Sequence, residues 1–553
     1  MRRRIILPGM RTVFNRYVMH LLTATVGECL NKAAIRNPAG VALITSHSGA
    51  SLTWQELNNE VQQVACGFLV AGLKKGDRLG IWSANSVEWI ICFLAAANIG
   101  VVTVGLNFQF QKREILNLIR LTHIDALCFS DGFRYNDFPA VVAELMQDAS
   151  LGRLRLTVAL GKNAIFPALP LAEIKALGST LPPAVYQQAQ AKVQSRDLLT
   201  LQLTSGSTAA PKRVMLSHYS VINNALFSTQ RLGVTHADTL CLAVPLFHCF
   251  GLSSGLLFAL HQGCKIVLLD NYSAEAVLKA IERYRCTVLY GVPTIFSLLM
   301  QHDAFSQYDV SSLDKGIVAG AYCSPRLISD ITQRLGMQHL AVSYGQTETS
   351  PCCTQTLFND PLVVKCFSVG KPLPFVEIKI IHTKTGALCS TGVSGEICSR
   401  GFHVMQDYDD ALEQTRAVLD SEGWLHTGDV GFMDAEGYLH YSYRLKEIIV
   451  RGGENISPRE IEEAILEYPG IESVKVFGIA SEALGEEIIA ALSVKSGYHI
   501  TESMLRDFLI PQLARYKIPV QFHFLAQFPY TPCGKIDVQQ LKLLTRAAEV
   551  SEK

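Results

Sequence analysis

The sequence lacks an excess of charge of either sign. Lysine and arginine total 49, aspartate and glutamate also total 49, and the formal net charge at pH 7 is zero. Proteins that bind nucleic acid usually carry a strongly basic surface, so this balance does not favour a nucleic-acid partner. Charged residues make up 18% of the chain and hydrophobic residues 49%, which excludes a disordered chain and favours a well-buried globular protein.

Paired cysteine motifs are also lacking. The 15 cysteines are odd in number and scattered, no Cys-x-x-Cys occurs, and only Cys352 and Cys353 are adjacent. Disulfide frameworks and structural zinc sites both need regularly spaced cysteines. We therefore expect reduced, buried thiols in a reducing compartment rather than a disulfide framework or a zinc site.

No apolar run is both long and uninterrupted. Residues 89–106 are nearly uncharged, but Asn98, Gly100 and Gly105 interrupt them, so a helix that leads into a buried strand is the better interpretation. Residues 240–260 contain Pro245, His248 and two glycines, which suits a soluble core. The sequence therefore predicts no transmembrane helix, and it leaves peripheral contact with a membrane and the oligomeric state open.

Acidic residues are absent before Glu28. The same stretch carries five arginines, Arg2, Arg3, Arg4, Arg11 and Arg16. A basic, acid-poor start is typical of a mitochondrial transit peptide, although this one is poor in serine. Residues 1–24 are therefore interpreted as a leader that directs the protein to the mitochondrial matrix. The alternative is a short basic tail on a cytoplasmic protein.

Apolar strands alternate with amphipathic helices up to about residue 345. Residues 55–71 place apolar side chains on one helical face, and residues 78–82 follow as a short strand. This alternation predicts an α/β protein with buried, mostly parallel sheets. Because 553 residues exceed one ordinary core, two to four structural units are expected.

A polar loop lies between the apolar segments 198–203 and 214–216, which predicts strand, loop, strand. Small residues let backbone N–H groups approach an anion, hydroxyls add donors, and a lysine adds charge. The loop is therefore a candidate phosphate-binding site, although it lacks the Walker pattern, and a polar surface turn is the alternative. Its residues are Thr204, Ser205, Gly206, Ser207, Thr208, Ala209, Ala210, Pro211 and Lys212.

Further polar groups follow apolar strands later in the chain. Residues 343–349 include Glu348, whose carboxylate suits Mg²⁺, and open α/β sheets bind ligands at such strand ends. Asp429 is a good acceptor for two ribose hydroxyls, and the alternative is a turn residue. Ser457 and Glu460 predict a capping box that starts a helix. A lysine on the turn at 530–537 would ordinarily be a solvated surface charge.

Two residues between 245 and 255 have competing interpretations. His248 lies among aromatic residues without a second ligand at metal spacing, so a core or gating residue is expected. Gly251-Leu252-Ser253-Ser254-Gly255 matches the nucleophile elbow of serine hydrolases. That elbow needs a strand directly before it, which Pro245 interrupts, so the hydrolase is the weaker alternative.

Five of these motifs, taken in order, resemble the core motifs of the adenylate-forming (ANL) superfamily, which contains acyl-CoA synthetases. They are residues 204–212, 344–348 and 427–429, Arg444 with 451–455, and 534–535. Strings at 25–30, 216–219 and 289–294 further resemble the mitochondrial medium-chain branch called acyl-CoA synthetase family member 2. The resemblance spans residues 25–543, and it implies a fatty acid–CoA ligase.

The resemblance implies a fold and a reaction. It implies a large N-terminal AMP-binding domain (25–443) of packed α/β sheets with a β-barrel-like subdomain. A hinge at 444–446 would lead to a small, mobile α+β lid domain (447–553). A fatty acid would react with Mg·ATP to give acyl-AMP and pyrophosphate, and coenzyme A would then take the acyl group and release AMP.

It also implies roles for individual residues. Lys535 would bridge the α-phosphate and the carboxylate, Glu348 and Thr208 would hold Mg²⁺, and His248 would gate the acyl tunnel. Asp429 and Arg444 would hold the ribose. Other nucleotide-binding positions are Gly320, Tyr344, Gly345, Gln346 and Thr347. Lys446 would be the hinge, and coenzyme A would meet Arg451, Gly452, Gly453 and Glu454.

Three positions depart from the family pattern. Ala209 and Arg213 replace glycines in the phosphate loop, and Tyr443 replaces a glycine before Arg444. If the first position needs a positive φ, alanine costs about 1 kcal/mol. Arg213 could add a charge near the phosphates or face solvent. An active ligase remains the expectation, and a nucleotide- or acyl-binding homologue that has lost catalysis is the alternative.

Overall fold

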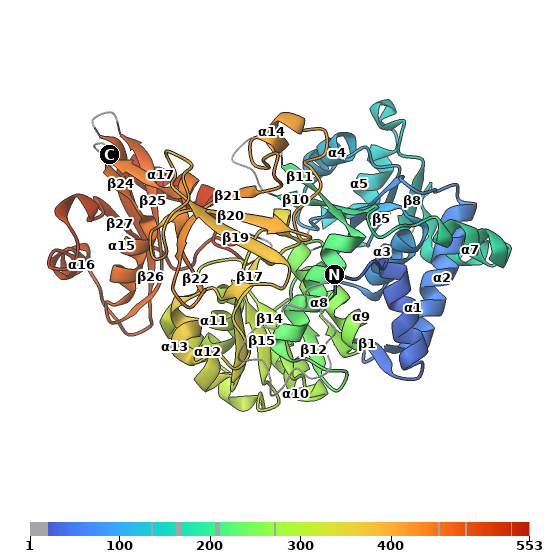
Figure 1. Cartoon of the computed structure of the whole chain (residues 1–553), viewed down its shortest axis with the longest axis horizontal. Helices are drawn as coiled ribbons and strands as arrows, with labels where there is room; N and C mark the ends of the chain where they lie inside the picture. Colours follow the sequence, from blue (N-terminus) through green and yellow to red (C-terminus); the bar gives the residue numbers. More distant parts are fainter. Residues whose placement is uncertain are drawn as a thin grey trace, which may run out of the picture.

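The computed structural model describes residues 20–133, 136–161, 167–204, 211–269, 272–451, 454–481, 484–531 and 534–551. Within these ranges the chain forms two large sheets, a small antiparallel sheet and a separate C-terminal sheet. Figure 1 shows the C-terminal elements, coloured orange to red, at one end of the elongated molecule.

The first large sheet has seven strands and the second has nine, and both are parallel except at their edges. The seven-stranded sheet runs β11 (Lys212–Ser217), β10 (Leu198–Thr204), β4 (Val102–Leu106), β3 (Arg78–Trp82), β5 (Ala126–Phe129), β8 (Leu156–Ala159), β9 (Leu169–Pro170). The nine-stranded sheet runs β18 (Lys371–Pro372), β17 (Thr354–Gln355), β16 (His339–Tyr344), β15 (Lys315–Val318), β14 (Val288–Gly291), β12 (Thr239–Leu242), β13 (Lys265–Leu268), β1 (Val41–Thr45), β2 (Ser51–Thr53). The predicted α/β class with mostly parallel sheets is confirmed.

Helices separate and cover these sheets (Figure 1). They are α1 (Val26–Arg36), α2 (Trp54–Val70), α3 (Val87–Ile99), α4 (Lys112–Leu121), α5 (Phe138–Leu145), α6 (Leu171–Gly178), α7 (Pro183–Ala191), α8 (His218–Leu232), α9 (Phe258–Gln262), α10 (Ala274–Tyr284), α11 (Pro293–Gln301), α12 (Pro325–Arg334), α13 (Leu362–Phe367) and α14 (Leu412–Arg416). The strands β6 (Gly132–Phe133) and β7 (Asn136–Asp137) form a short hairpin.

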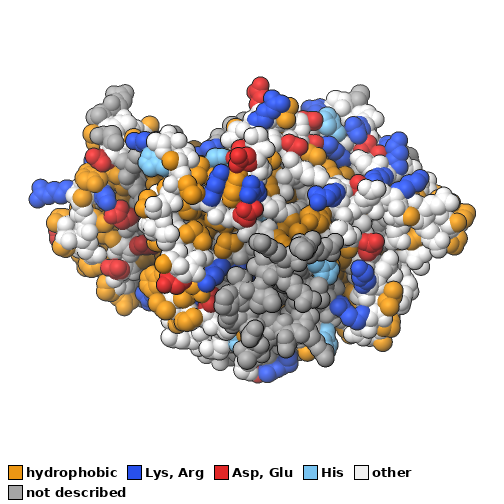
Figure 2. All heavy atoms as spheres, viewed as in Figure 1, with side chains coloured by type: hydrophobic (Ala, Val, Ile, Leu, Met, Phe, Trp, Pro, Cys, Tyr) orange, Lys and Arg blue, Asp and Glu red, His pale blue; other side chains and the backbone are white. Residues whose placement is uncertain are grey.

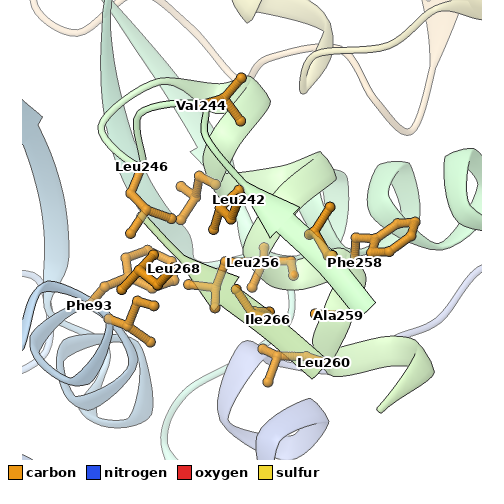
Figure 3. Close-up of a cluster of buried hydrophobic side chains, with 14 of the residues drawn as sticks. Phe93, Leu242, Val244, Leu246, Leu256, Phe258, Ala259, Leu260, Ile266 and Leu268 are labelled. Carbon is orange, nitrogen blue, oxygen red and sulfur yellow. The ribbon is translucent and has the colours of Figure 1, made fainter. Parts of the chain in front are cut away.

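Helix α3 explains the long apolar run at 89–106. Every residue from Trp89 to Ile99 is buried, because apolar side chains surround the whole helix. Phe93 belongs to the same cluster of buried side chains as Leu242 of β12, Leu268 of β13 and Phe258 of α9, and Figure 3 shows part of this cluster. The predicted helix followed by a buried strand is confirmed, and no helix in the described ranges is long and apolar enough to cross a membrane.

The small sheet carries β19 (Val376–Ile381), β20 (Gly395–Gly401), β21 (Leu425–Met433) and β22 (Leu439–Arg444). Its outer strands, β19 and β22, pair only with their inner neighbours among the described strands. The expected barrel-like subdomain is therefore an open antiparallel sheet. Four strands are too few to close on themselves, since the small closed barrels have about eight.

The C-terminal sheet runs β24 (Glu454–Ile456), β23 (Ile449–Arg451), β26 (Gly485–Val494), β25 (Ile471–Ser481), and β27 (Gln521–Phe524) pairs with β26. Helices α15 (Pro458–Leu466), α16 (Glu502–Leu509) and α17 (Val538–Ser551) accompany it. Two clusters of buried apolar side chains consist entirely of residues from Ile449 onward. This unit therefore has its own core, whereas the hinge at 444–446 and the exact domain boundaries stay predictions.

Helix α15 begins as predicted with Pro458 in its first turn, but the capping box is wrong. The Ser457 side chain makes no capping hydrogen bond. The Glu460 carboxylate instead accepts hydrogen bonds of 2.6 and 2.8 Å from Lys517 Nζ. Lys517, which folding brings close, thus binds the Glu460 carboxylate that the local sequence pattern predicted to cap the start of α15.

The described cysteines form no disulfide with one another. All described cysteines are free thiols, and all except Cys366 and Cys389 are buried.

Residues 1–19 of the expected leader lie outside the described residues. The fold begins within the remaining part, because Leu22 exchanges two backbone hydrogen bonds, of 2.7 and 3.0 Å, with the side chain of Asn223 on α8.

Candidate active site

The phosphate-loop candidate joins two paired strands. β10 and β11 are antiparallel, and Thr204 lies opposite Lys212, so the two ends of the loop are held side by side. The predicted strand–loop–strand arrangement is confirmed. Pro211 is described, but Ser205, Gly206, Ser207, Thr208, Ala209 and Ala210 lie outside the described residues. The effect of Ala209 and the role of Thr208 in holding a metal therefore stay predictions.

Lys212 and Glu348 meet through a tyrosine that the sequence analysis missed. Lys212 Nζ donates a 2.9 Å hydrogen bond to the Tyr408 hydroxyl, which donates a 2.6 Å bond to Glu348 Oε1. The ammonium also lies 4.4 Å from the centre of the Tyr408 ring, which adds cation–π attraction. Glu348 is buried in the turn Thr347–Thr349 directly after β16. A carboxylate and a cation are thus fixed at one strand end.

Tyr408 is held by a segment that extends the seven-stranded sheet. Along the outer edge of β11, Gln406 N donates to Met215 O at 2.9 Å and Asp409 N donates to Arg213 O at 2.8 Å. Met215 N donates in turn to Asp407 O at 3.0 Å. At its start, Met405 N donates to Glu348 O at 2.8 Å. Residues 405–409 therefore connect the exit strand of the loop to the Glu348 turn.

Arg213 neither faces solvent nor adds a free charge to the loop. Its Nε lies 3.2 Å from Asp409 Oδ2, and its side chain is 12% exposed. Arg78 of β3 makes a bidentate pair with the same carboxylate at 2.8 and 2.9 Å. One buried carboxylate thus balances two guanidinium groups. Asp409 therefore supplies an ion-pair partner for Arg213, the residue that departs from the family pattern.

Burial and neighbouring charges act on Lys212. Burial lowers the pKa of its amine, the Glu348 carboxylate raises it, and the cations of Lys446 and Arg444 lower it again. The overall direction is downward. A cluster of cations beside one buried carboxylate is an arrangement suited to a polyanion.

The candidate ribose site is built across β21 and β22. Asp429 and Arg444 are direct cross-strand partners, and Arg444 Nε donates a 2.7 Å hydrogen bond to Asp429 Oδ1. The Tyr344 hydroxyl donates to Asp429 Oδ2 at 2.9 Å. Burial lowers the pKa of Arg444, but the Asp429 carboxylate outweighs it and the net shift is upward. Asp429 is 2% exposed and therefore stays a fixed acceptor.

Gly345, which follows Tyr344, leaves no room for a side chain. A Cβ on Gly345 would lie 2.0 Å from Pro351 O, which no real structure tolerates. The backbone N–H of Gln346 donates to Thr349 Oγ1 at 2.9 Å, which closes the turn that carries Thr347. The polar group at 344–349 is therefore a tightly folded turn after β16 rather than a solvated loop.

Lys535 reaches the N-terminal unit. Gly320 has a φ of +85°, and a Cβ built there would lie 3.5 Å from Lys535 Cε and 3.9 Å from Lys535 Nζ. The neighbouring Gly534 carbonyl accepts a hydrogen bond from Thr294 Oγ1. The structure thus brings together Lys535 and Gly320, which lie more than two hundred positions apart in the sequence.

The two residues with competing interpretations, His248 and Ser253, lie in different surroundings. The His248 ring packs 4.2 Å from that of Phe247, and its buried Nε2 has no hydrogen-bond partner among the described residues. Ser253 is completely buried inside a π-helix, Phe250–Leu257, and its hydroxyl donates to Val221 O at 3.3 Å. A nucleophile elbow requires an exposed serine between a strand and a helix, so the hydrolase interpretation of Ser253 is wrong.

The described coenzyme A candidates make contacts within the C-terminal unit. Arg451 and Glu454 pair across the β23–β24 hairpin, and Arg451 NH1 donates to Tyr516 O at 3.0 Å. These contacts are all within the C-terminal unit. Gly452 and Gly453 lie outside the described residues. The structure therefore joins Lys535 to Gly320, Lys212 to Glu348 through Tyr408, and Asp429 to Arg444, whereas the contacts of Arg451 and Glu454 lie on the C-terminal unit.

The fold and this site define a nucleotide-binding enzyme whose small C-terminal unit supplies a lysine to the large unit. The profile of the family "AMP-binding enzyme" matches residues 30–409, and that of the "AMP-binding enzyme C-terminal domain" matches residues 460–535. The chain belongs to the AMP-binding enzyme family. The predicted adenylate-forming membership is thereby confirmed.

Similar proteins carry consistent names. The chain is 34% identical over 541 residues to a Bacillus subtilis protein named, provisionally, acyl-CoA synthetase YngI, covering 96% of this chain and 98% of that one. It is 35% identical to human "Medium-chain acyl-CoA ligase ACSF2, mitochondrial", covering 95% and 88%. ATP-bound MatB from Rhodopseudomonas palustris has the same fold, with a TM-score of 0.82, 24% identity and coverage of 94% and 98%. The enzyme class predicted from the sequence agrees with these names.

Proposed function

We propose that this chain is an AMP-forming fatty acid–CoA ligase that acts on medium-chain fatty acids. The proposal rests on the close approach of Lys535 to Gly320. The same structure contains the hydrogen bonds that link Lys212 to Glu348 through Tyr408, and the pair formed by Asp429 and Arg444. The names of the relatives support the reaction class and the chain length.

In the first half-reaction, the chain's residues overcome the repulsion between a carboxylate and a triphosphate. Lys212 and the loop before it hold the β- and γ-phosphates, and Asp429 holds the ribose hydroxyls. Lys535 lies between the α-phosphate and the fatty carboxylate and neutralises both as they approach. Fixed cations and donors stabilise the charge that develops on phosphate oxygens in such a displacement.

The site suits a magnesium ion at Glu348. Its carboxylate is buried, faces the cationic Lys212 through Tyr408, and is of the ligand type that Mg²⁺ prefers. Glu348 would hold the ion with Thr208, and the bound ion would neutralise phosphate charge. Removal of divalent ions should abolish pyrophosphate release.

For the second half-reaction, we propose that residues 447–553 rotate about the hinge at 444–446. Rotation would withdraw Lys535 and bring Arg451 and Glu454 towards the acyl-adenylate, where coenzyme A would take the acyl group. Domain closures commonly serve successive steps in this way. His248, whose Nε2 has no hydrogen-bond partner in the part of the chain that the structure describes, would line the entry of the acyl chain.

We also propose that the protein acts in mitochondria. The arginine-rich first sixteen residues and the mitochondrial name of the human relative support this location. A transit cleavage would fall before Leu22, because Leu22 is bound to Asn223 in the fold. Import of the full-length protein into isolated mitochondria, followed by N-terminal sequencing, tests both points.

The function is tested by measuring ATP-dependent pyrophosphate release across saturated fatty acids of increasing length, with and without coenzyme A. Release that needs a fatty acid, with formation of acyl-CoA, is expected. Lys535→Ala should slow adenylation about 100- to 1000-fold and spare thioester formation from preformed acyl-adenylate. Ser253→Ala, the control, should leave both steps intact. ATP binding without release for any acid would instead establish a binding protein that has lost catalysis.

A further inference from the structure

Three side chains with metal-binding atoms gather on the small sheet. Glu396 and Cys398 lie two residues apart on β20, and His426 lies on β21 directly opposite Cys398. The donor atoms of all three lie within 4.8 Å of one another. His426 Nδ1 is 3.1 Å from Glu396 Oε2 and 3.7 Å from Cys398 Sγ. No ligand spacing appears in the sequence, because the donors come from two strands about thirty positions apart.

The two distances from His426 Nδ1 suit tetrahedral coordination. With Zn–S near 2.3 Å and Zn–N near 2.0 Å, sulfur and nitrogen ligands of one zinc ion lie about 3.5 Å apart. The corresponding carboxylate oxygen and nitrogen lie about 3.4 Å apart. The observed separations of 3.7 and 3.1 Å differ from these values by about 0.3 Å or less. Small side-chain rotations would therefore accommodate an ion.

A carboxylate also lies near the other ring nitrogen of the histidine. His426 Nε2 lies 3.9 Å from Asp420 Oδ2, and the other Asp420 oxygen accepts 2.9 Å hydrogen bonds from the backbone N–H groups of Glu422 and Trp424. Metal-bound histidines usually direct their second nitrogen to such a fixed carboxylate, which sets the tautomer and strengthens the ligand. At 3.9 Å the Asp420 carboxylate is too far for a hydrogen bond in this arrangement, while Nδ1 faces Glu396 and Cys398.

Access from solvent suits the binding of an ion, and the thiol must lose its proton to take part. Cys398 is buried, whereas the side chains of Glu396 and His426 are 16% and 32% exposed. Burial, with a contribution from the Glu396 carboxylate, raises the pKa of the Cys398 thiol to about 12, although Lys379 opposes this. Binding of a metal would release the thiol proton to solvent. The nearby cations Lys379 and Arg400 lie over the Trp424 ring, at 4.3 and 4.4 Å.

We propose that Glu396, Cys398 and His426 form a binding site for a divalent ion of the Zn²⁺ class, with a fourth position left to water. The mixture of thiolate, imidazole and carboxylate favours Zn²⁺ or Co²⁺ over Mg²⁺ and Ca²⁺, which prefer oxygen ligands. The site is separate from the magnesium position at Glu348.

The metal site is coupled to the nucleotide site through one hydrogen bond. Gly428 N donates to Glu396 Oε1 at 3.2 Å, and the next residue is Asp429, the candidate ribose acceptor. An ion that draws Glu396 towards Cys398 would weaken this bond and shift the turn that carries Asp429. Zn²⁺ would then lower the affinity for ATP. This coupling rests on the proposed function, whereas the metal site does not.

The site is tested by titrating the metal-free full-length protein with Co²⁺ and recording its absorption. A thiolate–cobalt charge-transfer band with one ion per chain is expected, displaced by Zn²⁺. Cys398→Ala should abolish the band, whereas Cys389→Ala, a half-buried cysteine just before the same strand, should leave it unchanged. No band, or a band that survives in Cys398→Ala, would overturn the site and leave a structural Glu–His pair.

The coupling is tested by calorimetric titration of ATP with and without Zn²⁺. ATP affinity should fall in the presence of Zn²⁺ for the parent protein and stay constant for Cys398→Ala. Zn²⁺-independent ATP affinity alongside an intact cobalt band would overturn the coupling. If the ligase activity itself were absent, the cobalt band would persist, so the two proposals fail separately.

Discussion

The Tyr408 hydroxyl donates a 2.6 Å hydrogen bond to Glu348 and accepts one of 2.9 Å from Lys212. The tyrosine therefore holds a carboxylate and an ammonium apart at the point where the magnesium and phosphate groups of the substrate are expected. Without it, the two charges could pair directly, and both would be less available to the substrate.

Tyr408→Phe should therefore raise the Mg²⁺ concentration needed for half-maximal pyrophosphate release by roughly tenfold, because a hydrogen bond to a charged group contributes about 1.5–3 kcal/mol. Tyr438→Phe is the matched control, since its hydroxyl donates to the Asp360 carboxylate at 3.0 Å. An unchanged Mg²⁺ requirement in Tyr408→Phe, with normal stability, would show that Tyr408 does not position Glu348.

Asp409 should be far more important for stability than its neighbour. Asp409→Ala leaves Arg78 and Arg213 without their shared buried carboxylate, and breaking a buried pair costs about 3–5 kcal/mol. Asp410→Ala should cost less than about 1 kcal/mol, because its side chain is 59% exposed. Urea unfolding of both variants gives the comparison, and equal losses would contradict the proposed role of the buried carboxylate.

ATP affinity should decline with rising pH earlier than an ordinary lysine would allow. Burial lowers the pKa of Lys212 below its usual 10.5, so the amine loses its proton, and its attraction for phosphate, at a lower pH. Titrations of ATP from neutral to alkaline pH measure the effect. Lys212→Arg keeps its charge and should abolish this decline; the same pH profile in both proteins would exclude Lys212 as its source.

Arg459 should hold the C-terminal unit in the arrangement described here. Its guanidinium lies 3.8 Å from the Tyr322 ring centre and donates to the backbone carbonyls of Tyr441 and Ser442. Arg459→Ala should slow adenylation while sparing thioester formation from preformed acyl-adenylate. Lys517→Ala, which removes a pair with Glu460 inside the C-terminal unit, should affect neither step. Equal slowing of both steps in Arg459→Ala would indicate a general loss of folding.

The sequence was sufficient for features that depend on neighbouring residues. The strands around the phosphate loop and the helix before β4 follow from local apolar patterns, and both are confirmed. Asp429 and Arg444 could be proposed because each lies within a compact motif, although their direct pairing requires the β21–β22 register.

Tyr408 and Asp409 could not be found in this way. They reach the site because residues 405–409 pair with β11, nearly two hundred positions earlier, and such an edge pairing leaves no local signature. The sequence did contain a hint of this site. Two acidic residues follow a tyrosine at 408–410, and Arg78 and Arg213 are basic residues without an assigned partner in the sequence. The mistaken capping box at Ser457 has the same origin, since Lys517 arrives from a distant turn.

The pairing of residues 405–409 with β11 also bears on how this protein avoids self-association. β11 is the outermost strand of its sheet, and an exposed outermost strand offers unpaired N–H and C=O groups to any other extended chain. Here Met215 and Arg213 use these groups within the molecule. A change that detaches this segment would disturb the active site and expose a strand on which aggregates can grow. Loss of activity and precipitation would then share a single structural cause.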